Sequence, residues 1–265
     1  MPTTTVDGQP IRFDDTGGDG PAVLFAHGFL MDRTMFGPQV EALAPDFRCV
    51  SFDERGFGGT PVRGPFDYWD LAEDAVGLLD HLGVETAVLA GMSQGGFLAL
   101  RAALRHPDRL RGLVLIDTDA GVDDEETREG YRQMFRTWRE QGPIGPIVET
   151  LADLILGQDP ELRAAWIERW RAIDPEALEH PVACLLDRDD LTGRLDEIAC
   201  PVLVVHGEDD ESIPIGRAEA VARALPDCRG LVRVPGAMHA PVLSHPGVVN
   251  PPLRSFLEEV TGTAA

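Results

Sequence analysis

The chain has 265 residues and an apolar content of 43%, enough to bury a full hydrophobic core in one α/β domain that carries an insertion. Its 45 acidic residues outnumber 23 basic ones, none of which is lysine, and the formal net charge is −22. This charge repels nucleic acid and anionic membrane surfaces, so neither is expected as a partner.

Membrane and metal-binding classes are also disfavoured by the sequence. No stretch approaches the roughly 20 apolar residues of a membrane span, and residues 1–20 lack the basic and apolar regions of a signal peptide. We therefore expect a cytoplasmic protein. The cysteines are far apart and lack the paired spacing of a zinc cluster, so we expect free thiols. They are Cys49, Cys184, Cys200 and Cys228. No HExxH or similar ligand spacing occurs, so we expect no catalytic metal, and we expect no cofactor.

In chain order, short apolar runs alternate with longer amphipathic stretches. An edge strand, which we expect to be antiparallel, comes first at 9–17. Continuous apolar runs, typical of strands covered on both faces, lie at 22–28, 48–54, 87–93, 112–118, 201–207 and 229–235. Helices with apolar residues at three-to-four spacing are predicted at 34–44, 68–82, 97–106, 216–225 and 252–260. This alternation predicts an α/β fold with a mostly parallel, doubly wound sheet.

Residues 122–196 break this alternation, because they contain helical patterns without a clear strand. Three of the four tryptophans of the chain fall in this segment. An insertion after the fourth central strand would lie over the carboxyl ends of the strands, where open α/β sheets hold their ligands. The sequence thus predicts a core formed by residues 1–121 and 197–265, with a helical cap formed by 122–196.

The sequence GMSQGG, residues 91–96, places a serine between a predicted strand and a predicted helix. A serine at the apex of such a tight turn adopts a strained backbone, and its neighbours two residues away must be small. Gly91 and Gly95 meet that requirement, and the pattern is typical of a nucleophile elbow. An ordinary glycine-rich turn is the alternative. In this strand-to-helix context we predict that Ser93 is a catalytic nucleophile.

A serine nucleophile needs a base and a carboxylate that orients the base. Proteins with this elbow carry these groups in the chain order serine, acid, histidine. Asp210 and His239 follow two adjacent predicted strands, so both fall at carboxyl ends that can converge on the serine. They are the predicted acid and base. Asp209 and Asp117 remain alternatives for the acid, and His245 is the nearest alternative for the base.

Two backbone N–H groups are predicted to lie beside the serine as hydrogen-bond donors. Gln94 follows the serine at a helix N-terminus, where free N–H groups favour negative charge. Phe29, after the strand that ends in His-Gly, supplies the second N–H of an oxyanion hole. Candidate pocket-lining side chains are Leu30, Met92, Met134, Trp138 and Trp166, for each of which ordinary packing is the alternative.

Five segments together resemble the α/β-hydrolase superfamily across nearly the whole chain, the cap excepted. They are HGF at 27–29, DERGFGGT at 53–60, residues 91–118, PVLVVHGEDDESIP at 201–214 and GAMH at 236–239. The resemblance implies a Ser-His-Asp hydrolase whose motif positions are Ser93, Asp210, His239, Phe29 and Gln94. It also implies that Asp53 and Arg55 are structural. The serine at the elbow differs from the dehalogenase and epoxide-hydrolase branches, which place an aspartate there.

We therefore expect a serine carboxylesterase that cleaves a small or medium ester through an acyl-enzyme. Its partner is a small-molecule ester or lactone, and a homo-oligomer is compatible with the sequence. Fold and triad are shared with enol-lactone hydrolases, cofactor-free perhydrolases and C–C bond hydrolases. Perhydrolases of this family often carry tryptophan after the His-Gly pair, so Phe29 disfavours that activity. A small-molecule receptor on the same fold is the alternative from another class.

Overall fold

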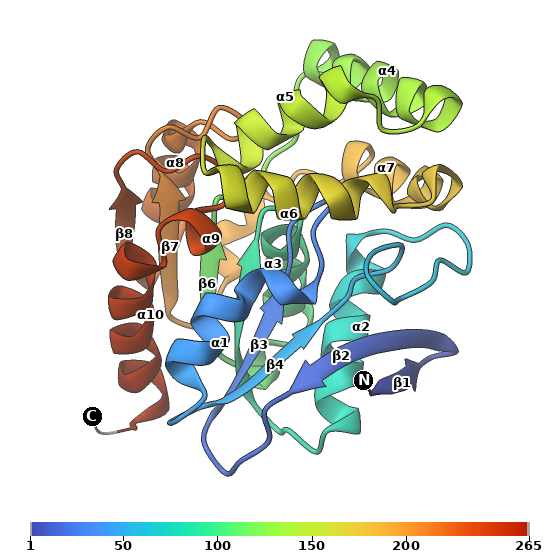
Figure 1. Cartoon of the computed structure of the whole chain (residues 1–265). Coiled ribbons are helices and arrows are strands. Elements are labelled where there is room, and N and C mark those ends of the chain that lie inside the picture. Colours follow the sequence, from blue (N-terminus) through green and yellow to red (C-terminus); the bar gives the residue numbers. More distant parts are fainter. Residues whose placement is uncertain (1, 264–265) are drawn as a thin grey trace.

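The computed structural model describes residues 2–263 and contains one eight-stranded sheet between two layers of helices (Figure 1). The strands are β1 (Thr3–Val6), β2 (Gln9–Asp15), β3 (Ala22–Ala26), β4 (Arg48–Phe52), β5 (Ala87–Met92), β6 (Leu110–Ile116), β7 (Val202–Gly207) and β8 (Cys228–Val234). Their order in the sheet is β1-β2-β4-β3-β5-β6-β7-β8. Strand β1 pairs antiparallel with β2 and β2 pairs antiparallel with β4, whereas the pairs from β4 to β8 are parallel, which confirms the predicted mostly parallel sheet. The strand predicted at 9–17 is antiparallel as expected, but it is not the edge, because β1 pairs with its outer side.

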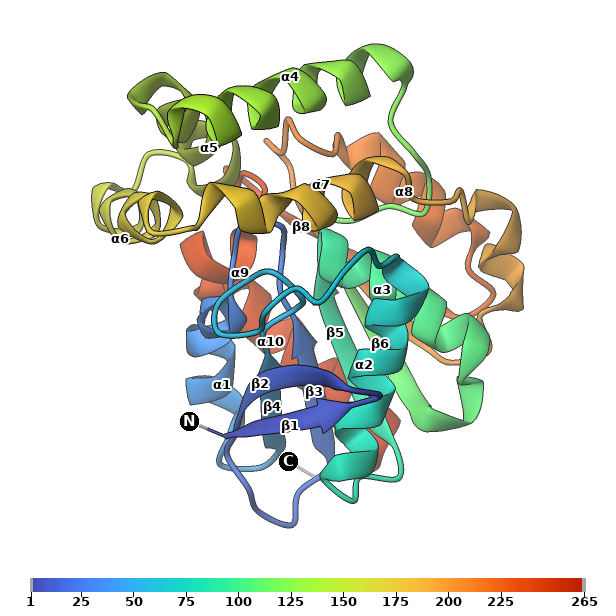
Figure 2. The ribbon, with the colours of Figure 1, turned by 90° about the vertical axis from the view of Figure 1, so that its right-hand side faces the viewer.

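Helices cover both faces of the sheet (Figure 2). One face carries α2 (Tyr68–His81), α3 (Gln94–Arg105) and α8 (Ile215–Ala224). The opposite face carries α1 (Gly37–Leu43) and α10 (Pro246–Thr261), with the short α9 (Pro241–Ser244) beside them. None of the helices in the described part of the chain has the length and apolar character needed to cross a bilayer.

Alternation of side chains along the buried strands divides the core into two parts. In β3, Leu24 and Ala26 pack on the face that carries α2 and α3. Val23 and Phe25 pack on the face of α1 and α10. Both faces are covered, so each position of the strand is apolar, which explains why these strands appear in the sequence as continuous runs.

The chain between β6 and β7 forms a group of helices at the carboxyl ends of the parallel strands (Figures 1 and 2). They are α4 (Glu125–Gln141), α5 (Gly145–Leu156), α6 (Pro160–Arg171) and α7 (Glu179–Leu186). Asp124 and Asp159 accept backbone N–H groups at the starts of α4 and α6. Gly142 and Gly157, both with positive φ, end α4 and α5. Local sequence thus sets the boundaries of this helical segment.

A buried ion pair fixes the loop that follows β4. The Asp53 carboxylate is fully buried and accepts from the Arg33 guanidinium at 2.8 Å, from the Arg33 backbone N–H at 2.9 Å and from the Gly59 N–H at 2.7 Å. Arg55 pairs with Asp74 of α2 at 2.6 Å. Asp53 and Arg55 therefore both hold this loop against its neighbours.

We expect Arg33→Met to destabilise the protein by about 3 kcal/mol or more, because it leaves the Asp53 carboxylate buried without its cationic partner. Arg229→Met removes a pair between exposed side chains, Arg229 and Asp227, and should cost no more than about 1 kcal/mol. Denaturant unfolding of both variants measures the difference. Equal losses would contradict a special role for the buried pair.

Candidate active site

Ser93 lies at the turn between β5 and α3 and has φ +52° and ψ −115°, a strained conformation for a residue other than glycine. A Cβ built on Gly91 would overlap the carbonyl of Gly95, and one built on Gly95 would overlap the carbonyl of Ala26. The Ser93 N–H donates to Ile116 O at 2.9 Å, and its carbonyl accepts from Thr118 Oγ1 at 2.8 Å. β6 and the residues that follow it thus hold the turn through hydrogen bonds, and the close approach to Ala26 of β3 leaves no room for a side chain on the other side.

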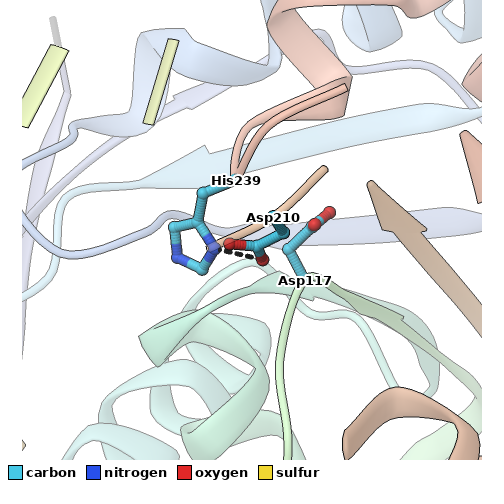
Figure 3. Close-up of side chains that lie close together, drawn as sticks. All are labelled: Asp117, Asp210 and His239. Atoms are coloured by element: carbon cyan, nitrogen blue, oxygen red, sulfur yellow. Dashed lines mark hydrogen bonds and ion pairs between the residues drawn. The ribbon is translucent and has the colours of Figure 1, made fainter. Parts of the chain in front are cut away.

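Asp210 and His239 come together from the loops after β7 and β8 (Figure 3). His239 Nδ1 lies 2.7 Å from Asp210 Oδ2, and both residues are buried. The other oxygen, Oδ1, accepts from the backbone N–H groups of Ser212 at 2.8 Å and Ile213 at 3.1 Å. The loop therefore orients the carboxylate toward the imidazole.

Of the three rival candidates, Asp209 and His245 have other surroundings, whereas Asp117 lies beside the pair. Asp209 is exposed, and its backbone N–H donates to Ala237 O at 3.0 Å. His245 Nδ1 lies 2.8 Å from Ser244 Oγ, within its own loop. Asp117 lies close to the pair, since its carboxylate, that of Asp210 and the His239 ring have ligand atoms within 4.8 Å of one another (Figure 3).

The two neighbouring carboxyl groups differ in their pKa. Burial raises the pKa of Asp117 well above its usual range, and the nearby charge of Asp210 adds to this effect. Burial would also raise the pKa of Asp210, but the charge and hydrogen bond of His239 and the Ile213 N–H hold that pKa below its usual value. Asp117 is therefore the group of the pair that binds a proton more readily, and Asp210 is the group that ionises more readily.

His206, at the end of β7, places a second imidazole ring next to the Asp210 carboxylate. Its Nε2 lies 2.7 Å from Ile213 O and 3.4 Å from Asp210 Oδ2. The carbonyl of Ile213 can only accept, so Nε2 carries the proton. Burial lowers the pKa of His206, which keeps the ring neutral. Asp210 thus faces two imidazole rings, the neutral ring of His206 and the ring of His239.

The cluster of Asp117, Asp210 and His239 has ligand types that also bind metal ions. A zinc ion bonds to nitrogen and oxygen at about 2.0–2.2 Å, which at a tetrahedral angle places the two ligand atoms roughly 3.3 Å apart. The separation of 2.7 Å between His239 Nδ1 and Asp210 Oδ2 is that of a hydrogen bond. The geometry fits a shared proton better than a shared cation.

The loop after β3 carries the predicted donor Phe29. The next residue, Leu30, has φ +63°, which is again unusual for a side chain of its size. Trp170 Nε1 of α6 donates to Leu30 O at 2.9 Å, and the Phe29 ring packs edge-on against Phe57 and Phe135. Gln94 is the first residue of α3, so its N–H has no acceptor within the helix.

A cavity joins these elements, and both Ser93 and His239 line it. Of the predicted lining residues, Leu30, Met92 and Met134 are among those that line it. The structure places the other two elsewhere. Trp138 is fully buried in the core, and Trp166 lines a separate hollow near Arg169. Helical periodicity indicates that these tryptophans are buried, but it does not indicate against which partner.

The cavity also contains residues that the sequence reasoning missed. Asp123, Tyr131, Arg188 and Ser212 line it, as does Phe97, one helical turn after Ser93. Only Phe97 has a sequence signal, because its spacing of four from the serine places both residues on one face of α3. Asp123, Tyr131 and Arg188 come from segments with no motif, and Ser212 lies in the segment 201–214 without a pattern that marks it as a lining residue.

The proton on Asp117 gives a prediction for stability. A group whose pKa is raised by folding stabilises the protein below its ordinary pKa, and that contribution is lost as pH rises toward the raised value. Asp117→Asn mimics the neutral acid and does not titrate. Relative to the wild type, the variant should gain about 1.4 kcal/mol per pH unit above roughly pH 4.

Denaturant unfolding of the wild type and of Asp117→Asn over a pH series measures this difference. Asp209→Asn, which changes the exposed carboxylate next to Asp210, serves as the control. A difference between wild type and Asp117→Asn that stays constant with pH would mean that Asp117 is ionised in the folded protein.

Comparison with known proteins agrees with this fold. Residues 21–246 match the protein family described as alpha/beta hydrolase fold. The structure of a thermophilic esterase from Thermogutta terrifontis is 35% identical, with a TM-score of 0.89, and the match covers 98% of this chain and 97% of that one. The pimeloyl-(acyl-carrier protein) methyl ester esterase of Xanthomonas oryzae pv. oryzae is 31% identical over 263 residues, 93% of this chain and 98% of the relative.

The enol-lactonase from Burkholderia xenovorans LB400 superposes with a TM-score of 0.88 over 97% of this chain and 99% of its own, and at 24% identity this likeness supports the fold alone. The family match and the esterase relatives support a hydrolase activity. The chain therefore belongs to the alpha/beta hydrolase fold family.

Proposed function

We propose that this protein is a carboxylic ester hydrolase in which Ser93 is the nucleophile, His239 the base and Asp210 the orienting acid. The observation that carries the proposal is the shared cavity. A strained serine lines it together with a histidine whose Nδ1 lies 2.7 Å from a buried carboxylate. Such an arrangement is what a serine hydroxyl needs to become a nucleophile at neutral pH.

In the first half of the reaction, Ser93 Oγ attacks the ester carbonyl carbon and His239 Nε2 takes the hydroxyl proton. The tetrahedral intermediate then expels the alcohol, which receives that proton, and an acyl-serine remains. In the second half, His239 removes a proton from water, the resulting hydroxide attacks the acyl-serine, and the acid leaves as Ser93 regains its proton. Asp210 stabilises the imidazolium that forms in each half. No cofactor is required.

The backbone N–H groups of Gln94 and Phe29 stabilise the negative charge that develops on the carbonyl oxygen. Removing one such donor typically costs about 10² to 10³ in kcat. The free N–H at the start of α3 and the strained loop at Leu30 support this assignment. Both donors belong to backbone held by neighbouring elements, so they need no reorganisation during the reaction.

The lining of the cavity supports a small or medium, largely apolar ester. The loop after β3 and helix α3 supply part of it, and α4, α5 and α7 supply Met134, Phe135, Leu151, Leu154, Ile155 and Leu185. Helices α4–α7 thus act as a cap, which corresponds to the predicted segment 122–196. Such a cap excludes water from the acyl group and positions it.

Ser93→Ala should lower kcat by a factor on the order of 10⁶ while leaving thermal unfolding nearly unchanged, since the hydroxyl is needed for the chemistry alone. The substrates are p-nitrophenyl esters of increasing chain length. Ser51→Ala, which changes a buried serine of β4, is the control and should retain activity.

Intact-mass spectrometry after treatment with a fluorophosphonate, followed by peptide mapping, tests the same claim without turnover. A single adduct on Ser93 that is absent from Ser93→Ala supports the proposal. A protein that binds ester analogues without an adduct and without hydrolysis would instead be a small-molecule receptor.

The hydrogen bond from Trp170 Nε1 of α6 to Leu30 O, which we call the tether, holds the loop after β3 that carries Phe29. This tether gives a second prediction. Trp170→Phe keeps an aromatic ring but removes the indole N–H that donates to Leu30 O, so we expect kcat to fall about tenfold with little change in KM. Trp138 is equally buried, but its Nε1 has no hydrogen-bond partner in the described structure. Trp138→Phe is therefore the matched control, and equal effects of the two substitutions would contradict the tether.

A further inference from the structure

Four polar side chains line one part of the otherwise mainly apolar cavity. Asp123, Tyr131, Arg188 and Ser212, which we call the polar wall, line the same cavity as Ser93 and His239. The proposed mechanism uses none of them. A pocket that is mostly apolar with a few polar groups uses those groups to choose and orient its ligand.

Arg188 is the buried cation of the polar wall. Its side chain is 2% exposed. Nε donates to Gly121 O at 3.1 Å, Nη1 to Leu185 O at 2.8 Å and Nη2 to Asp123 Oδ2 at 3.1 Å. A guanidinium has five N–H donors, so one on Nη1 and one on Nη2 have no acceptor within residues 2–263. Buried donors of this kind favour a ligand that accepts from them.

Arg188 is also close to the proposed point of reaction. Its guanidinium carbon lies 4.4 Å from the centroid of the Phe97 ring. Phe97 lies in the first turn of α3, four residues after Ser93, and lines the same cavity as Ser93 and Arg188. A side chain of a substrate bound to Ser93 can therefore reach this guanidinium within the cavity.

The charges around Arg188 are already balanced. Asp123 accepts from Arg188 and, through Oδ1, from Arg217 at 3.1 Å. Arg217 also donates to Asp119 at 2.7 Å. The guanidinium groups of Arg188 and Arg217 thus form ion pairs with two carboxylates, those of Asp119 and Asp123. A third carboxylate, brought by a substrate, would leave a net negative charge in a chain whose formal charge is −22. An uncharged oxygen avoids that cost.

We propose that Arg188 selects substrates by donating hydrogen bonds to an uncharged oxygen acceptor, a carbonyl or an ether, in the part of the ester that lies beside Phe97. The substrate class is then oxo- or alkoxy-substituted esters of short chain rather than plain alkyl esters. The inference rests on the proposed function, since it names the substrate of that same site.

The test compares esters that match in shape and differ in one group. Methyl valerate, methyl levulinate and monomethyl succinate carry at the same place a methylene, a ketone and a carboxylate. Butyl acetate and methoxyethyl acetate make the corresponding pair on the alcohol side, with an ether oxygen in place of a methylene. Acid release in a pH-stat gives kcat/KM for each ester.

The readout is the ratio of kcat/KM values within each matched pair, which does not depend on how much of a variant is folded. We expect Arg188→Met to lower the levulinate-to-valerate ratio or the methoxyethyl-to-butyl ratio about tenfold, the effect of one hydrogen bond to a charged group. Arg188→Lys retains a donor and should lose less.

Arg101→Met is the matched control. Arg101 is buried and donates to Phe97 O at 2.8 Å, but it is not one of the residues that line this cavity. Its replacement should leave both ratios unchanged, and both arginine variants should lose some thermal stability through lost packing.

Hydrolysis of the plain esters with ratios that Arg188→Met does not change would overturn the inference and leave the proposed function standing. An Arg188-dependent preference for monomethyl succinate would also overturn it, because the acceptor would then be a carboxylate. Hydrolysis of none of the five esters by the wild type would contradict the proposed function and the inference together.

Discussion

The site depends on one crowded turn. Ser93 can take its strained conformation because glycines stand two residues before and after it. Gly91 lies against the Gly95 carbonyl and Gly95 lies against the Ala26 carbonyl, so neither position has room for a Cβ. A side chain at Gly91 or Gly95 would separate α3 from β3 and β5. Parallel strands on both sides hold the turn, so the strain at the serine is balanced by ordinary sheet pairing.

Burial controls the ionisation of the two carboxyl groups, Asp117 and Asp210, that lie near that turn. The carboxyl groups of Asp117 and Asp210 lie within a few ångströms of each other in a region that excludes water, and two negative charges there would repel strongly. The hydrogen bonds decide which group is ionised. Asp210 has two backbone donors and an imidazole, whereas the only donor to the Asp117 carboxylate among the described residues is the Gly207 N–H. Asp117 therefore completes the packing as a neutral group.

The helical segment between β6 and β7 does more than cover the sheet. Through Trp170 it contacts the backbone of the loop after β3 at Leu30, and through Arg188 and Asp123 it supplies polar side chains to the cavity. The core thus carries the groups proposed for the chemistry, while the helical segment carries most of the groups proposed for selection.

The sequence by itself determined the elements whose signals are local. Apolar runs predicted the parallel strands, the glycines around Ser93 predicted the turn, and the positions of Asp210 and His239 after adjacent strands predicted that their side chains meet. Only the tertiary structure decided which cap residues line the cavity. Helical periodicity identifies a buried face, but its partner depends on how several helices pack together, so Trp138 lies in the core while Arg188 lines the cavity.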